Sequence, residues 1–85
     1  DIANIGILML SYERRPNNNP EEIIVLGEYI IQNINIDQLM YAENYGASEV
    51  KNNLRVVLRV LRRAYEATNN HIEYEKIQGI LNKYW

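Results

Sequence analysis

The sequence predicts an all-α fold, a compact bundle of four to five helices with a long central fourth helix. From Ser48 to Thr68, apolar residues recur at helical spacing for about six turns, without a glycine or proline. Other segments with the same period are separated by proline, glycine and asparagine. The 85 residues suffice for one hydrophobic core and little more, so we expect a single domain.

The first helix is expected from Ile2 to about Arg14. Its apolar residues at helical spacing are Ile2, Ile5, Leu8, Met9 and Tyr12. Gly6 and the apolar run Ile7–Leu10 also permit a strand, and we favour the helix. The stretch from Arg15 to Pro20 is rich in proline and asparagine, which predicts a loop.

The second helix is expected from Pro20 to about Gln32. Asn19 is a suitable N-cap, and proline at the first helical position loses no hydrogen bond because that N–H has no helical partner. The apolar residues of this segment are Ile23, Ile24, Leu26, Ile30 and Ile31, with Val25 and Tyr29 at the flanks. We expect the helix to be buried on more than one side.

A third helix is expected after Asn35, which is followed three residues later by Gln38 in the spacing of a capping box. It should end near Tyr45, because Gly46 can adopt the left-handed conformation that closes a helix. Ser48 can then cap the next helix almost at once. The sequence therefore predicts a tight corner between two helices.

The fourth helix, Ser48–Thr68, is amphipathic. Its apolar arc consists of Val50, Leu54, Val57, Leu58, Leu61, Ala64 and Tyr65, widened by Val56 and Val60. Basic residues fill a band on the remaining surface, namely Lys51, Arg55, Arg59, Arg62 and Arg63. We expect this helix to be central to the core and to leave a positive band exposed.

The last helix is expected after Asn70, which with Glu73 again has capping spacing. Its apolar residues are Ile72, Ile77, Ile80, Leu81 and Tyr84. Trp85 follows this helix and either covers the edge of the core or extends away from it.

Charge is distributed unevenly along the chain. Up to Glu49 there are eight acidic and two basic residues, whereas from Val50 onward there are seven basic and three acidic residues. This separation indicates one acidic and one basic face, although internal pairing and helix dipoles explain part of it. A rigid basic band is suited to an acidic partner.

The residues needed for catalysis or cofactor binding are scarce, so we predict that the protein is not an enzyme and has no cofactor or metal site. His71 is the one histidine, cysteine is absent, and the four glycines form no phosphate-binding loop. No run approaches the roughly 20 apolar residues of a membrane span. The absence of cysteine favours an intracellular location, cytoplasmic or nuclear. Because the chain begins with Asp1, we expect it to be excised from a longer protein.

The corner in IDQLMYAENYGASEVKNNLRVVLRVLRR resembles a helix-turn-helix DNA-binding motif, with Ala42, then Gly46, then Ser48 opening a basic helix. The apolar positions Val50 and Leu54 come about two residues earlier than the motif places them. The resemblance implies DNA contacts by Ser48, Glu49, Lys51, Asn52, Asn53 and Arg55.

The order of several short motifs is also similar to the N-terminal helical domain of transcription elongation factor S and its relatives. These motifs are Ile36-Asp37-Gln38-Leu39, Gly46, Val50, Leu54-Arg55 and Ile80-Leu81-Asn82-Lys83-Tyr84-Trp85. The corner is two or three residues too long for that family, and the fourth helix too extended. The resemblance implies transcription regulation through binding of short acidic or aromatic peptide segments.

The predicted function is a protein–protein interaction module that binds an acidic or amphipathic segment through the basic band. Tyr41 and Tyr45, one turn apart on the expected third helix, would flank a groove against the fourth helix. Two alternatives remain, which are DNA binding and assembly as a homo-oligomer. An oligomer would cover an apolar excess that includes Ile24, Ile31, Val56 and Val60.

Overall fold

The computed structural model describes residues 2–16, 19–42 and 47–85, which form five helices and no strand. The helices are α1 (Ile2–Glu13), α2 (Pro20–Asn33), α3 (Ile36–Met40), α4 (Ala47–Ala67) and α5 (His71–Tyr84). This confirms the predicted all-α bundle with a long fourth helix. The segment Ile7–Leu10, which also permitted a strand, is helical.

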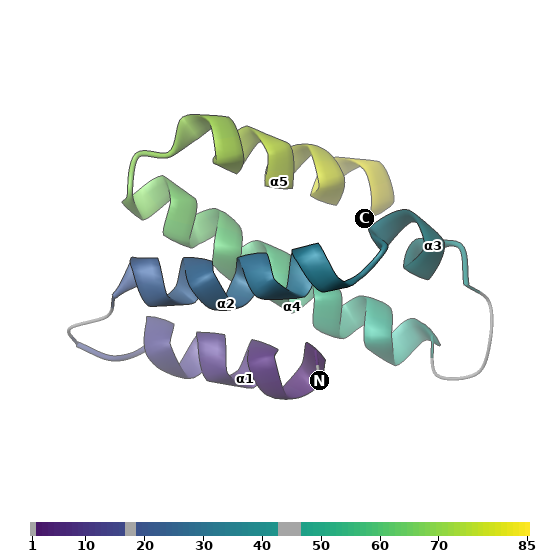
Figure 1. The fold of residues 1–85 in the computed structure, drawn as a ribbon, viewed down its shortest axis with the longest axis horizontal. Coiled ribbons are helices and arrows are strands. Elements are labelled where there is room, and N and C mark those ends of the chain that lie inside the picture. The colour runs from purple at the N-terminus through teal and green to yellow at the C-terminus, as the bar shows by residue number, and fades with distance from the viewer. Residues whose placement is uncertain (1, 17–18, 43–46) are drawn as a thin grey trace.

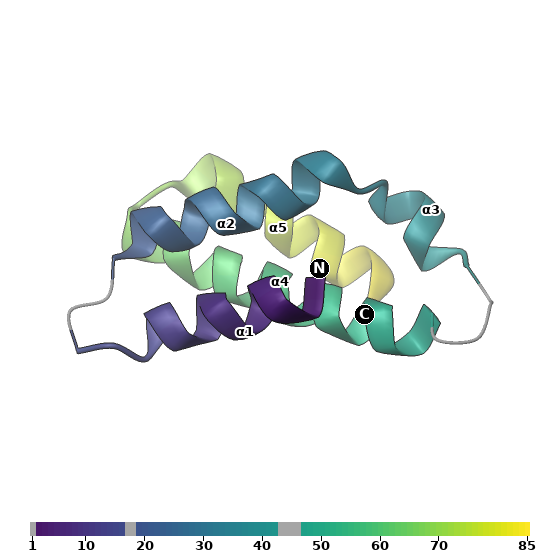
Figure 2. The same cartoon turned by 60° about the horizontal axis from the view of Figure 1, so that its bottom comes forward.

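Helix α4 organises the bundle, because it is the longest helix and packs against each of the other four. Figure 1 shows α1 and α2 running antiparallel on one side of α4, with α5 folding back along another side. A view turned by 60° again places α1 and α5 to either side of α4 (Figure 2). The body they form measures 39 × 25 × 19 Å.

The buried face of α4 is the one that the sequence predicts. Its buried residues are Ala47, Leu54, Val57, Leu58, Val60, Leu61, Ala64 and Tyr65. Met9 of α1, Ile23 and Ile30 of α2, and Ile77 and Leu81 of α5 complete this core. The core therefore draws on four helices, and α4 contributes its largest share.

The apolar residues that suggested an oligomer pack in or against the core of the chain itself. Val60 is 1% exposed, so it belongs to the core and cannot form part of an assembly surface. Ile24, Ile31 and Val56 are partly buried and pack against the same core. The predicted patch therefore lacks Val60, and its other three residues are only partly exposed.

Helix α1 turns largely the predicted face to the core, because Ile2, Ile5 and Tyr12 pack against it and Leu8 is the exception. Gly6 and Met9 are buried, whereas Leu8 is 39% exposed. A Cβ at position 6 would lie 3.5 Å from the Val57 Cγ2 atom, so α1 approaches α4 through its glycine. Leu10, instead of Leu8, packs against the core.

The three predicted asparagine N-caps are confirmed. In each, the side-chain oxygen accepts a hydrogen bond from a backbone N–H of the first turn, a bond that satisfies a donor with no helical partner. The pairs are Asn19 with Glu21, Asn35 with Gln38, and Asn70 with Glu73. At the other end of α4, Asn69 adopts a left-handed φ of 57°, which allows the chain to turn into α5.

The corner between α3 and α4 differs from the prediction. Helix α3 ends at Met40, with Tyr41 as its C-cap, so the predicted end near Tyr45 was wrong. The Ala42 N–H donates to the Leu39 carbonyl, a tightened final turn that ends the helix. Helix α4 begins at Ala47, so Ser48 lies inside its first turn instead of capping it. Tyr45 and Gly46 lie outside the described residues.

Candidate functional site

The basic residues of α4 divide between two surfaces, because adjacent residues on a helix point about 100° apart. Arg63 faces α1, where its Nε and Nη2 atoms donate to the two carboxylate oxygens of Glu13 at 2.7 and 2.8 Å. These hydrogen bonds raise the pKa of Arg63. Arg62 faces α5, where its Nη1 atom donates to the Gln78 Oε1 atom at 2.8 Å. The prediction of one continuous band therefore fails at Arg63, which is neutralised by the acidic half.

Arg55 and Arg59 are exposed, and no carboxylate among the described residues pairs with either of them. Together with Arg62 they line a hollow of about 180 Å³ between α4 and α5, which we call the arginine hollow. Its other lining residues are Gln78, Leu81, Asn82 and Trp85. No described side chain that lines it carries a negative charge.

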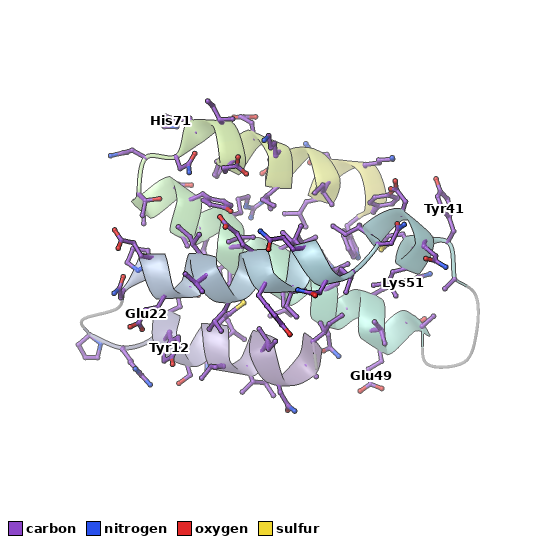
Figure 3. The ribbon with its side chains drawn as sticks, in the orientation of Figure 1. Tyr12, Glu22, Tyr41, Glu49, Lys51 and His71 are labelled. Atoms are coloured by element: carbon purple, nitrogen blue, oxygen red, sulfur yellow. The ribbon has the colours of Figure 1, made fainter. Side chains whose placement is uncertain are left out.

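A second hollow, of about 620 Å³, lies where the ends of α3 and α5 meet the beginning of α4, and we call it the aromatic hollow. It is lined by Met40, Tyr41, Ser48, Lys51, Asn52, Lys83, Tyr84 and Trp85. The rings of Tyr41 and Tyr84 meet edge to face, with centroids 6.4 Å apart. Lys51 donates from its Nζ atom to the Ala42 carbonyl at 2.9 Å, and Figure 3 shows Tyr41 and Lys51 at the same end of the molecule.

Trp85 lines both hollows, so they are neighbours, and we call the two together the α4–α5 groove. The structure thus brings together five of the seven predicted site residues, which are Tyr41, Lys51, Arg55, Arg59 and Arg62. Arg63 lies outside the groove, and Tyr45 lies outside the described residues.

Sequence reasoning missed the contribution of α5. We expected the floor of the groove between the third and fourth helices, but α3 has only five residues, and Leu81, Tyr84 and Trp85 take that place. Gln78 with Asn82, and Leu81 with Trp85, are each four residues apart and share faces of α5. That spacing is visible in the sequence, but it does not show which side of α4 these faces meet.

The groove is positive because its cations are mostly not neutralised. Lys83 lies 3.6 Å from Asp37 in an exposed ion pair, so its charge is partly balanced. Arg55 and Arg59 are four residues apart on α4, a like-charge spacing that costs about 0.2 to 0.5 kcal/mol in an isolated helix. Guanidinium groups only donate hydrogen bonds, so the arginines of the groove are chemically suited to anionic groups.

The described part of the chain offers little for a metal site or a membrane-spanning segment. No three histidine or acidic side chains there come together in a group that could hold a metal ion. His71 is exposed at the start of α5, at the opposite end of the molecule from Tyr41 (Figure 3). None of the described helices combines the length and apolar character needed to cross a bilayer.

Comparisons with protein-family models, curated proteins and solved structures found no match to this chain. The helix-turn-helix resemblance depended on Ala42, Gly46 and Ser48. Ala42 follows the end of α3 instead of lying on it, and Gly46 lies outside the described residues.

Proposed function

We propose that the protein is a non-enzymatic interaction module that binds an acidic or amphipathic segment of a partner protein in the α4–α5 groove. One observation carries the proposal. Arg55 and Arg59 are exposed, line a hollow without a described carboxylate, and have no acidic partner within the described residues. Arg63 on the same helix does have such a partner in Glu13.

Recognition would combine charge with an apolar contact. Acidic side chains of the partner would bind the guanidinium groups of the arginine hollow, which sets orientation and speeds association. An apolar or aromatic side chain of the partner would pack against Tyr41, Tyr84 and Trp85 in the aromatic hollow, where most of the affinity would arise. This division between charged rim and aromatic anchor is common in peptide-binding grooves.

The proposal is tested by reversing charge in the groove. The double variant Arg55→Glu/Arg59→Glu should weaken binding of a degenerate peptide library with fixed glutamates by about tenfold or more. Both side chains are exposed, so the free energy of unfolding should change by no more than about 0.5 kcal/mol. Fluorescence titration gives the affinity, and urea denaturation gives the stability.

The matched control is Arg14→Glu/Arg15→Glu, which changes the net charge equally. Both residues are exposed and follow α1, whose C-terminal end lies far from the C-terminal end of α5 (Figure 1). Peptide binding should survive in this variant. An equal loss of peptide binding in both double variants would show that net charge alone causes the loss. Unchanged binding in the groove variant would refute the proposal.

A further inference from the structure

We propose that the arginine hollow recognises a phosphorylated serine or threonine in the bound segment. This inference rests on the proposed function and specifies its ligand. Arg55, Arg59 and Arg62 occupy positions i, i+4 and i+7 of α4, so their side chains rise from one stripe of the helix. All three line the same hollow of about 180 Å³.

One of these arginines is held in place by α5. The Gln78 Nε2 atom donates to the Asn82 Oδ1 atom at 2.9 Å, and the Gln78 Oε1 atom accepts from the Arg62 Nη1 atom at 2.8 Å. This chain of amide hydrogen bonds fixes the Arg62 guanidinium while using one of its five N–H donors. A donor oriented in advance binds its acceptor at a lower entropic cost.

The charge of the hollow matches a phosphoryl group better than a carboxylate. A phosphoserine carries about −1.5 to −2 charges at pH 7 and three acceptor oxygens. It can therefore accept hydrogen bonds from three guanidinium groups together, and the planar fork of arginine matches phosphate geometry. A single carboxylate has one charge and two oxygens, so it would leave part of this cluster without a counter-charge.

The neighbouring aromatic hollow favours a peptide over a membrane surface. It shares Trp85 with the arginine hollow and offers Tyr41 and Tyr84 for apolar contacts. The centres of the two hollows are about eight residues apart along α4, or about 12 Å. An extended peptide covers that distance in about three to four residues. We therefore expect an apolar or aromatic residue about three to four positions from the phosphorylated one.

The test compares three peptide libraries of equal length and degenerate flanks, with phosphoserine, glutamate or alanine at the central position. Trp85 is the single tryptophan of the chain and lines both hollows, so its fluorescence reports binding directly. The phosphoserine library should bind about tenfold or more tightly than the glutamate library. Within it, bound peptides should be enriched in apolar residues at the expected distance.

The triple variant Arg55→Lys/Arg59→Lys/Arg62→Lys keeps the positive charge but removes the planar guanidinium groups. It should retain binding of the glutamate library and lose the preference for phosphoserine. Circular dichroism and a thermal melt check that the variant is folded. Should it fail to fold, Gln78→Ala, which frees Arg62, should reduce the same preference.

Each remaining outcome is decisive. Equal binding of the phosphoserine and glutamate libraries would overturn the inference and leave the proposed function standing. Binding of neither library would overturn both. Binding to phosphatidylcholine vesicles that contain a phosphoinositide, but to no peptide, would assign the hollow to a lipid headgroup and would also overturn both proposals.

Discussion

At the residue scale, Gly27 shows how closely the helices pack. A Cβ at this position of α2 would lie 2.9 Å from the Leu61 Cδ1 atom and 3.2 Å from its Cγ atom. Leu61 is fully buried in α4, so it has little room to move away. The substitution Gly27→Ala should overpack this contact at a cost of about 1 to 3 kcal/mol, offset by up to about 1 kcal/mol of helix propensity. Urea denaturation should show a net loss of stability.

Gly79 provides the matched control, because it also lies within a helix. A Cβ there would have no neighbour within 4 Å, and the residue is exposed on α5. Gly79→Ala should therefore stabilise the protein by about 0.5 to 1 kcal/mol through helix propensity alone. If both variants gained stability equally, the close approach of α2 to α4 would be disproved.

Residue roles that depend on near neighbours in the chain could be predicted, whereas those that depend on packing could not. The caps Asn19, Asn35 and Asn70 follow from the two or three residues after them, and all three are confirmed. The burial of Gly6 depends on the contact of α1 with α4, and the position of Trp85 depends on where α5 lies. Periodicity identifies which residues of a helix share a face, but not which neighbour that face meets.

At the element scale, a partly buried hydrogen bond joins α2 to α4. The Tyr65 hydroxyl donates to the Glu28 carboxylate at 2.7 Å, and Tyr65 is 2% exposed. Burial, with this hydrogen bond and the charge of Glu28, raises the pKa of Tyr65 above its ordinary value. The folded state therefore holds the phenol proton after the unfolded chain has released it.

This shift predicts a loss of stability at alkaline pH. The contribution is complete below the ordinary tyrosine pKa of about 10 and is lost as the pH rises through the higher pKa of folded Tyr65. Within this window, the free energy of unfolding should fall by about 1.4 kcal/mol per pH unit. Urea denaturation from about pH 9 to pH 11 measures this slope across the start of the window.

Two phenylalanine variants isolate the contribution of Tyr65. Tyr65→Phe should lower the free energy of unfolding by about 1 to 2 kcal/mol at neutral pH. It should also flatten the alkaline slope, because the phenol with the raised pKa is absent. Tyr29→Phe, on the exposed side of α2, should change neither quantity, since its ring is 58% exposed. If the alkaline slope persisted in Tyr65→Phe, the loss of stability would have to come from other titrating groups.

The helices themselves were predicted better than the corner between α3 and α4. The long amphipathic period of α4 sets its extent, and the observed range Ala47–Ala67 is one residue from the predicted Ser48–Thr68. Helix α3 is shorter than the range that ended near Tyr45. A helix of five residues is too short for periodicity to fix its end, so its last turn depends on local hydrogen bonds.

At the scale of the whole molecule, the separation of acidic and basic halves is only partly relieved by folding. Arg63 with Glu13 and Lys83 with Asp37 are ion pairs that cross between the halves. Arg55 and Arg59 keep no described carboxylate partner, so the α4–α5 groove stays positive on a chain with a net charge of −2. The charge pattern predicted that a basic surface would remain exposed on α4. It did not predict that α5 would form one side of that surface.

This balance of charges also leads to different predictions for a peptide and for duplex DNA as the partner. Non-specific DNA binding comes from phosphate contacts, and each contact adds about 0.9 to the slope of log K against log salt. Apart from Lys83, which pairs with Asp37, the groove offers Lys51, Arg55, Arg59 and Arg62 for such contacts, which would give a slope of about −3.6. The negative net charge opposes the approach of a long polyanion.

We therefore expect no measurable binding of random duplex DNA at physiological ionic strength, whereas a short acidic peptide should still bind. Fluorescence anisotropy of labelled duplex, titrated with protein at several salt concentrations, measures this directly. A peptide carries few charges, so its affinity should depend less steeply on salt than that of DNA. Tight duplex binding with a slope near −3.6, abolished in Arg55→Glu/Arg59→Glu, would instead identify the groove as a DNA-binding surface.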